Sequence, residues 1–150
     1  MWCSSSRPAV STARYRFLAE DEPLWRRRVA ETHAATDILG AKRVEFLGCQ
    51  DSGMMGTETS DAPGSFWTAS VEEAAERLAA VLREENADVL TVYDDNGGYG
   101  HPDHIQVHRV GMRAAELAGT ARVYRSTMNC DHMRRGMARF AGLTAGRFPT

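Results

Sequence analysis

Residues 88–108 read DVLTVYDDNGGYGHPDHIQVH, and this stretch decides the fold of the chain. Its first six residues form a near-continuous apolar run, as in strands buried within parallel sheets. The next seven residues include three glycines and an asparagine, which predict a sharp turn with positive φ angles. Pro102 suits the first turn of a helix, because its missing N–H needs no partner there. The stretch therefore predicts a strand, a turn and a helix that runs to about Ala118 and ends at Gly119.

The segments upstream continue this alternation of helix and strand. Apolar residues recur at helical spacing between Leu24 and Leu39, and Gly40 is a natural left-handed stop for this helix. The residues expected on its buried face are Trp25, Val29, Ala30, Ala34 and Ile38. Residues 42–48, KRVEFLG, then predict a short strand.

A long loop and a second capped helix follow. Residues 48–69 show neither helical nor strand periodicity, which predicts a loop of functional or disordered character. Ser70 and Glu73 form a capping box that opens the next helix. The expected buried stripes are Val71, Ala74, Ala75, Leu78 and Val81 in this helix, and Val107, Val110, Ala114 and Leu117 in the helix after Pro102. Residues 122–127 predict the last strand.

This order of helix, strand, helix, strand, helix and strand predicts an α/β fold. We expect an open, mostly parallel sheet with helices on both faces. We divide the chain into a disordered or aberrant segment at 1–22, a folded domain at 23–128 and a tail at 129–150. The first segment has no acidic residue before Glu20, which also suits an organellar transit peptide, although a disordered or misdefined start is the preferred interpretation.

Composition excludes several functional classes. The 150 residues are 43% hydrophobic and 25% charged, which is typical of one globular domain. The formal net charge of −2 argues against a nucleic-acid partner, and no run approaches the roughly 20 apolar residues of a membrane span. Three widely separated cysteines form neither a CxxC pair nor a disulfide framework, which indicates a reducing compartment. We therefore expect a cytoplasmic protein.

The histidines after the best strand are the strongest candidates for chemistry. His101 and His104 flank Pro102 and Asp103 at the carboxyl end of a strand, where open α/β sheets bind ligands. Neutral imidazoles suit a divalent metal, and a carboxylate can orient a neighbouring ring. Catalytic zinc takes three protein ligands, however, and this loop offers one or two. We interpret His108 alone as a structural residue.

Three segments, in matching order, resemble the PIG-L/LmbE-like zinc N-deacetylase family. VLTVYDDNGGYGHPDH resembles the second signature of that family, RVAETHAATDILGA from Arg28 resembles its Arg-x-x-Glu helix, and DSGMMG at 51–56 resembles its substrate loop. The resemblance covers about residues 26–119 and is closest to the mycothiol-pathway branch of N-acetylglucosaminyl-inositol deacetylases and mycothiol conjugate amidases. It implies a Rossmann-like sheet.

The resemblance also implies residue roles. His104 is similar to a metal ligand, for which the family uses Zn²⁺. His101 resembles the histidine that steadies the oxyanion and assists departure of the amine, Asp103 the aspartate that orients it, and Tyr99 a tyrosine that contacts the acetyl group. The substrate-binding positions that the resemblance implies are Arg28, Asp51 and Met54. The implied partner is a small N-acetylated amino sugar, from which the acetyl group is hydrolysed.

The sequence departs from the family at its first motif. The family begins with a strand and a His-Pro-Asp-Asp motif that supplies two metal ligands and the general base, whereas this sequence has a single HPD, at His101. We therefore expect a Rossmann-like sheet that lacks its first βα unit, and an inactive or impaired fragment. A non-catalytic sugar-binding pseudo-enzyme and, within the family, a conjugate amidase remain open alternatives.

The incomplete ligand set leads to a direct prediction. Purified chain 1–150 should retain little or no zinc and release no measurable acetate from an N-acetylglucosaminide, since one or two histidines do not make a catalytic zinc site. Metal analysis and an acetate assay measure both properties. Stoichiometric zinc together with acetate release would contradict this expectation.

Overall fold

The computed structural model describes residues 22–144, and the segment predicted as aberrant therefore lies almost wholly outside the described residues. The elements are α1 (Leu24–Leu39), α2 (Val71–Glu84), β1 (Val89–Tyr93), α3 (Gly97–Gly100), α4 (Pro102–Ala118), β2 (Arg122–Ser126) and α5 (Cys130–Thr144). The predicted strand, turn and helix of residues 88–118 are confirmed. Gly40 and Gly119 both adopt the left-handed conformation that ends a helix.

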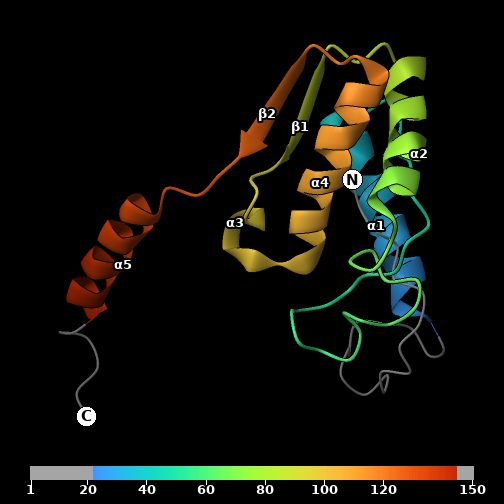
Figure 1. The fold of residues 1–150 in the computed structure, drawn as a ribbon. Helices are drawn as coiled ribbons and strands as arrows, with labels where there is room; N and C mark the ends of the chain where they lie inside the picture. Colours follow the sequence, from blue (N-terminus) through green and yellow to red (C-terminus); the bar gives the residue numbers. More distant parts are fainter. Residues whose placement is uncertain (1–21, 145–150) are drawn as a thin grey trace.

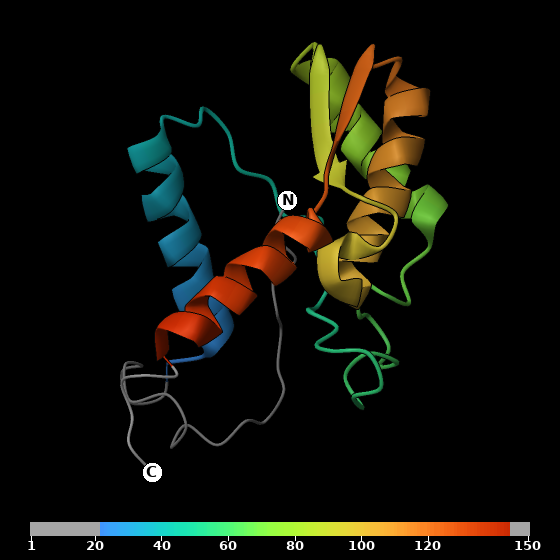
Figure 2. The same ribbon diagram turned by 90° about the vertical axis from the view of Figure 1, so that its left-hand side faces the viewer.

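Two parallel strands form a small open sheet. β1 pairs with β2 in a register that runs from Val89 opposite Arg122 to Tyr93 opposite Ser126. Helices α2 and α4 lie side by side on one face of the sheet (Figure 1), and α1 lies on the other side (Figure 2). This arrangement confirms a mixed α/β architecture with parallel strand neighbours.

The core lies between α2 and α4. The Ser70 hydroxyl accepts a hydrogen bond from the Glu73 N–H, as the capping box predicts. The buried residues of this core cluster are Cys49, Phe66, Ala74, Ala75, Leu78, Ala79, Leu82, Val110 and Ala114. At the surface the Arg113 guanidinium pairs with the Glu72 carboxylate at 2.7 Å. The small side chains at this interface let the two helices approach each other closely. This packing fixes the position of α4 on its face of the sheet.

Helix α4 also packs closely against β1. A Cβ added at Gly111 would lie 2.4 Å from Cγ1 of Val92 and 3.7 Å from Cδ2 of Leu90. Carbon atoms in proteins do not approach that closely without repulsion, so this position requires glycine for packing. The contact fixes the position of α4 along β1, the strand that precedes the loop with His101.

Helix α1 corrects one expectation. The helix forms where its periodicity predicts, but none of its residues is buried, and Ile38 and Leu39 are 87% and 81% exposed. The predicted buried face is therefore wrong. Apolar spacing shows which side of a helix can be covered, but the described residues provide no layer that packs against this side.

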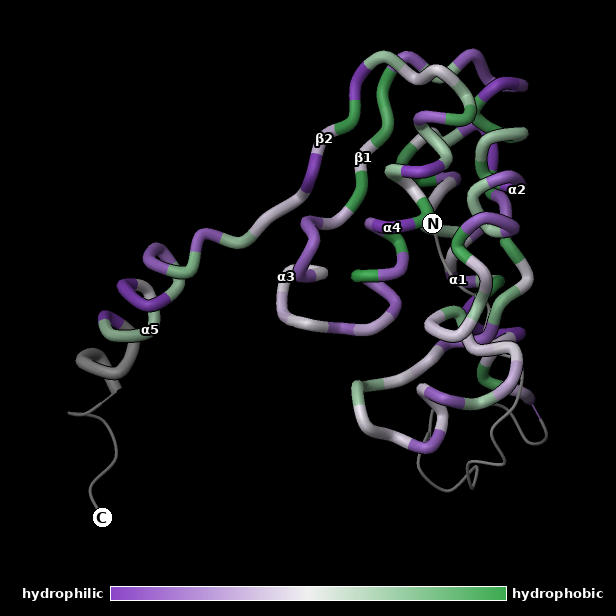
Figure 3. The backbone as a smooth tube through the Cα atoms, viewed as in Figure 1, coloured by the Kyte–Doolittle hydropathy of each residue, from purple (hydrophilic) through white to green (hydrophobic). Residues whose placement is uncertain are grey.

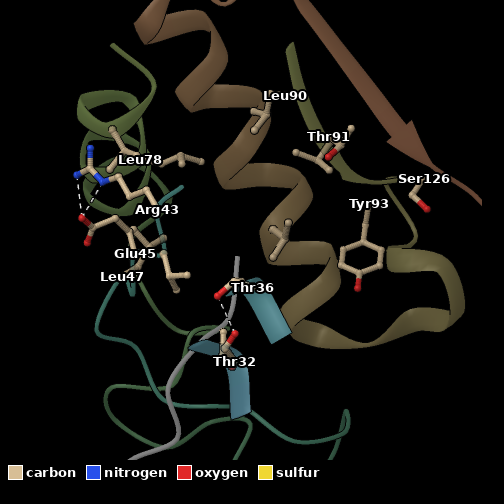
Figure 4. A pocket seen from close by; sticks show the side chains of 14 residues that line it. Thr32, Thr36, Arg43, Glu45, Leu47, Leu78, Leu90, Thr91, Tyr93 and Ser126 are labelled. Carbon is tan, nitrogen blue, oxygen red and sulfur yellow. Dashed lines mark hydrogen bonds and ion pairs between the residues drawn. The ribbon is translucent and has the colours of Figure 1, made fainter. Parts of the chain in front are cut away.

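The predicted strand at residues 42–48 is a second correction, because this segment is extended but joins no sheet. A cavity of about 620 Å³ separates it from β1 and is lined by side chains that include Val44, Leu47, Leu90 and Val92 (Figure 4). Strand pairing requires backbones about 4.8 Å apart. The cavity occupies the space that such pairing would close.

The C-terminal segment contains a helix where a tail was expected. α5 follows an extended connection after β2 and reaches away from the other elements (Figure 1). Its apolar residues Met133 and Met137 are exposed at helical spacing. The sequence shows too short an amphipathic period to predict this helix. No helix among the described residues has the length and apolar character needed to cross a membrane.

The close approach of α4 to β1 predicts the effect of Gly111→Ala. Alanine favours a helix over glycine by about 1 kcal/mol, but the methyl group would overlap Val92, and overpacking costs about 1–3 kcal/mol. Urea unfolding should therefore show a net loss of stability, and the loss should shrink in the Val92→Ala background.

Gly136→Ala is the matched control, since a Cβ at this glycine of α5 meets no atom within 4 Å. This variant should be neutral or slightly stabilising. Equal effects of Gly111→Ala and Gly136→Ala would contradict the packing account.

Candidate active site

A polar turn follows the apolar strand β1 (Figure 3). The Asp94 carboxylate accepts a hydrogen bond from the Gly98 N–H at 2.7 Å. This bond, followed by one from the Thr127 side chain, holds the pKa of the Asp94 carboxyl below its usual value. The ionised carboxylate therefore stabilises the turn at neutral pH, and its contribution is lost as the pH falls through the lowered pKa.

Gly97 lets the turn fold back onto α4. Its φ angle is +61°, and an added Cβ would lie 2.8 Å from the Ile105 nitrogen and 2.9 Å from the His104 Cβ. Gly98 also has a positive φ of +74°, but open space surrounds its Cβ position. The two glycines therefore differ: both permit the turn, and Gly97 alone permits its contact with the helix.

His101 caps the amino end of α4. Its Nδ1 accepts a hydrogen bond from the Asp103 N–H at 3.2 Å. A neutral imidazole that accepts at Nδ1 carries its proton on Nε2. The half-buried ring of His101 therefore presents an N–H donor, which is the form needed to hydrogen-bond an oxyanion.

Asp103 joins the histidine loop to the preceding long loop. Its side chain is buried, with 8% exposed, and its Oδ2 accepts a hydrogen bond from the Ser52 N–H at 3.1 Å. The other carboxylate oxygen, Oδ1, is buried without a hydrogen-bond partner. Asp103 thus contacts His101 through its backbone N–H, while its carboxylate holds the loop of the DSGM segment.

His104 lies in a cluster of aromatic rings. Its Nδ1–H donates to the Gly97 carbonyl at 3.1 Å, so Nε2 is the nitrogen left for a ligand. The Tyr93 ring stacks on it with centroids 3.9 Å apart, and the His101 ring lies at 4.7 Å. The exposed Tyr99 ring meets His104 edge-on at 5.2 Å. The structure therefore brings together His101, His104, Asp103 and Tyr99.

The loop at residues 48–69 is called the tethered loop below, because the Asp103 carboxylate binds its Ser52 N–H. Among the predicted substrate-binding residues, Asp51 and Met54 lie on this loop. The Asp51 carboxylate accepts from the Gly53 N–H at 2.8 Å, and Met54 is half-exposed. The Ser52 hydroxyl also accepts from the Trp67 N–H at 2.9 Å, which closes the loop on itself. Arg28 lies instead on α1, where its guanidinium pairs with Glu31 at 2.8 Å.

Sequence reasoning missed two residues of this site. Ser52 supplies the N–H that the Asp103 carboxylate binds, and Tyr93 supplies the ring beneath His104. The signals were the place of Ser52 within DSGM and that of Tyr93 as the last residue of β1. His108 has the structural part expected of it, since its Nδ1–H donates to the Tyr93 carbonyl at 3.0 Å.

The residues described do not fit a complete metal site. Catalytic zinc takes three protein ligands, and no group of three His, Cys, Asp or Glu side chains in the described part of the chain could hold a metal ion. His104, with Nδ1 fixed by a carbonyl, has the form of one metal ligand. Its neighbours do not supply the rest.

The contrast between Gly97 and Gly98 predicts a difference between two alanine variants. Both substitutions should lower the free energy of unfolding, because alanine disfavours a positive φ. Gly97→Ala should also displace His104, since its methyl group would overlap α4, whereas Gly98→Ala should leave His104 in place. Urea unfolding and the NMR signals of His104 measure the two effects. An unmoved His104 in Gly97→Ala would show that the turn does not lie against α4.

Comparison with known proteins shows the family of the chain. The family model of GlcNAc-PI de-N-acetylase, PIG-L, matches residues 6–115. A 1D-myo-inositol 2-acetamido-2-deoxy-alpha-D-glucopyranoside deacetylase of Streptomyces griseus is 44% identical over 144 residues, which cover 86% of this chain and 45% of the relative. Proteins with the same name (in the second case with the number 1 appended) from Salinispora arenicola and Catenulispora acidiphila are 45% and 57% identical over 130 and 95 residues.

These two alignments cover 81% and 61% of this chain and 42% and 29% of the relatives. The chain thus spans less than half the length of the curated relatives that it matches. The family match includes the tethered loop, β1, the glycine turn and most of α4. The chain belongs to the PIG-L family of GlcNAc-PI de-N-acetylases.

Proposed function

We propose that this chain forms the part of a deacetylase that carries the HPDH loop, and that the substrate is an N-acetylglucosaminyl-inositol. The observation that carries the proposal is the hydrogen bond between Asp103 and Ser52, which joins the two loops that match the family motifs. The relatives named as deacetylases of this glycoside support the substrate class. A cytoplasmic site of action and a Rossmann-like sheet belong to the same proposal.

The reaction is hydrolysis of an acetamide. Water adds to the carbonyl carbon, the C–N bond breaks, and the amine leaves with a proton while acetate is released. His101 is suited to both steps that follow: its Nε2–H can hydrogen-bond the oxyanion, and once the ring has taken up the proton lost by the attacking water, the imidazolium can protonate the departing nitrogen. Tyr99 is exposed beside His101, and its hydroxyl donates a hydrogen bond to the reacting acetyl group.

The remaining roles concern binding. Asp51 and Met54 contact the sugar from the tethered loop, and Arg28 binds a substrate hydroxyl or another polar group. His104 would contribute one ligand to a divalent metal, for which the family resemblance favours zinc. The described residues do not complete its coordination, and the roles of His101 and Tyr99 are those that the family resemblance implies.

A sugar-binding protein without catalysis is the second candidate. It is favoured by one observation, namely that the described residues group no three metal-binding side chains. It predicts that the chain binds N-acetylglucosaminyl-inositol but that its histidine loop does not support hydrolysis. A conjugate amidase would share the site and differ in the acyl group released.

A chimera distinguishes these functions. Residues 22–119 of this chain replace the aligned segment of the Streptomyces griseus relative, and acetate release from N-acetylglucosaminyl-inositol is measured. The chimera should be active, and His101→Gln should lower kcat by about 100-fold or more, because the proton donor is lost. His33→Gln in the same chimera, at an exposed position of α1, is the matched control and should leave kcat unchanged.

Two outcomes would contradict the deacetylase proposal. A folded chimera that binds the glycoside without releasing acetate would favour the sugar-binding protein. An active chimera that is indifferent to His101→Gln would remove His101 from the reaction.

A further inference from the structure

The stacked pair of Tyr93 and His104 is distinct among the ring contacts of the described residues. The two rings are nearly parallel, with 5° between their planes, and their centroids are 3.9 Å apart. Every other ring pair recorded here is at least 4.7 Å apart and inclined by 30° or more. Contact across a whole ring face restricts the rotation of an imidazole more strongly than an edge contact does.

Tyr93 is itself held firmly at the end of β1. Its carbonyl accepts a hydrogen bond from His108 Nδ1–H at 3.0 Å, which ties the strand to α4. Tyr93 also pairs with Ser126 of β2 in the sheet. The ring therefore stands on two regular elements, and a side chain on such a base can fix the position of a neighbour.

The Tyr93 ring also lies beside a cavity. Tyr93 lines the cavity of about 620 Å³ beside β1, and Figure 4 shows its ring at one end of that cavity. Removal of the ring would extend the cavity to the imidazole. His104 would then be free to rotate away from the Gly97 carbonyl that fixes its Nδ1–H.

We infer that Tyr93 is a positioning residue for His104, which keeps the imidazole in one orientation and one tautomer with Nε2 available to a ligand. The inference deepens the proposed function, because it concerns the orientation of a residue that the proposal places in the site. The ring face supplies the effect, so the tyrosine hydroxyl is not required.

NMR of the full chain with ¹⁵N-labelled histidine tests the inference. The unmodified chain should show nuclear Overhauser contacts between the Tyr93 and His104 rings and, for neutral His104, the nitrogen shifts of an Nδ1–H tautomer. Tyr93→Leu should lose the single-tautomer pattern, whereas Tyr93→Phe should keep it. Tyr124→Leu is the matched control, since this tyrosine is exposed on the neighbouring strand β2.

The outcomes separate positioning from general loss of structure. A folded Tyr93→Leu variant with unchanged His104 shifts would overturn the inference, and so would a Tyr93→Phe variant that behaves like Tyr93→Leu. If Tyr93→Leu does not fold, the ring-to-ring contacts of the unmodified chain and the Tyr93→Phe spectrum decide instead. None of these signals depends on catalysis, so an inactive chimera would count against the proposed function and leave the positioning of His104 intact.

Discussion

The hydrogen bond from the Ser52 N–H to the Asp103 carboxylate is the constraint on which the site depends. It joins a loop without regular structure to the first turn of α4, across 51 residues of sequence. A hydrogen bond to a charged group contributes about 1.5–3 kcal/mol, and a buried unpaired acceptor costs about 1–3 kcal/mol. The two oxygens of Asp103 therefore act on stability in opposite directions. Its placement is better explained by the geometry that it gives the two loops.

The packing beneath the site supplies the precision that this bond needs. Gly111 brings α4 against Val92 of β1, and Gly97 brings the turn back onto the same helix. His101 and His104 lie at the amino end of that helix, so their positions follow from the backbone rather than from a mobile loop. The rings of Tyr93 and Tyr99 then restrict the imidazoles from the strand and from the turn. In a site built in this way, substitution of a distant glycine such as Gly111 should displace the two histidine side chains.

Local signals predicted much of this structure. A capping box, two glycine stops and a proline at the first helical turn placed the ends of α1, α2 and α4, because each of these effects acts within a few residues. The same holds for the turn that gathers His101, Asp103 and His104. The two wrong predictions of the fold share one cause. The face of α1 and the strand at 42–48 depend on what packs against them, and periodicity does not identify a partner. Ser52 and Tyr93 were missed for the same reason.

Amide hydrogen exchange at Ser52 tests the central claim most directly, because this amide is the donor in the bond that unites the site. The account predicts that the Ser52 N–H exchanges slowly in the unmodified chain and that Asp103→Ala removes this protection while the amides of α2 remain protected. Slow exchange that survives Asp103→Ala, or exchange in the unmodified chain as fast as in an open loop, would show that Asp103 does not hold the two loops together.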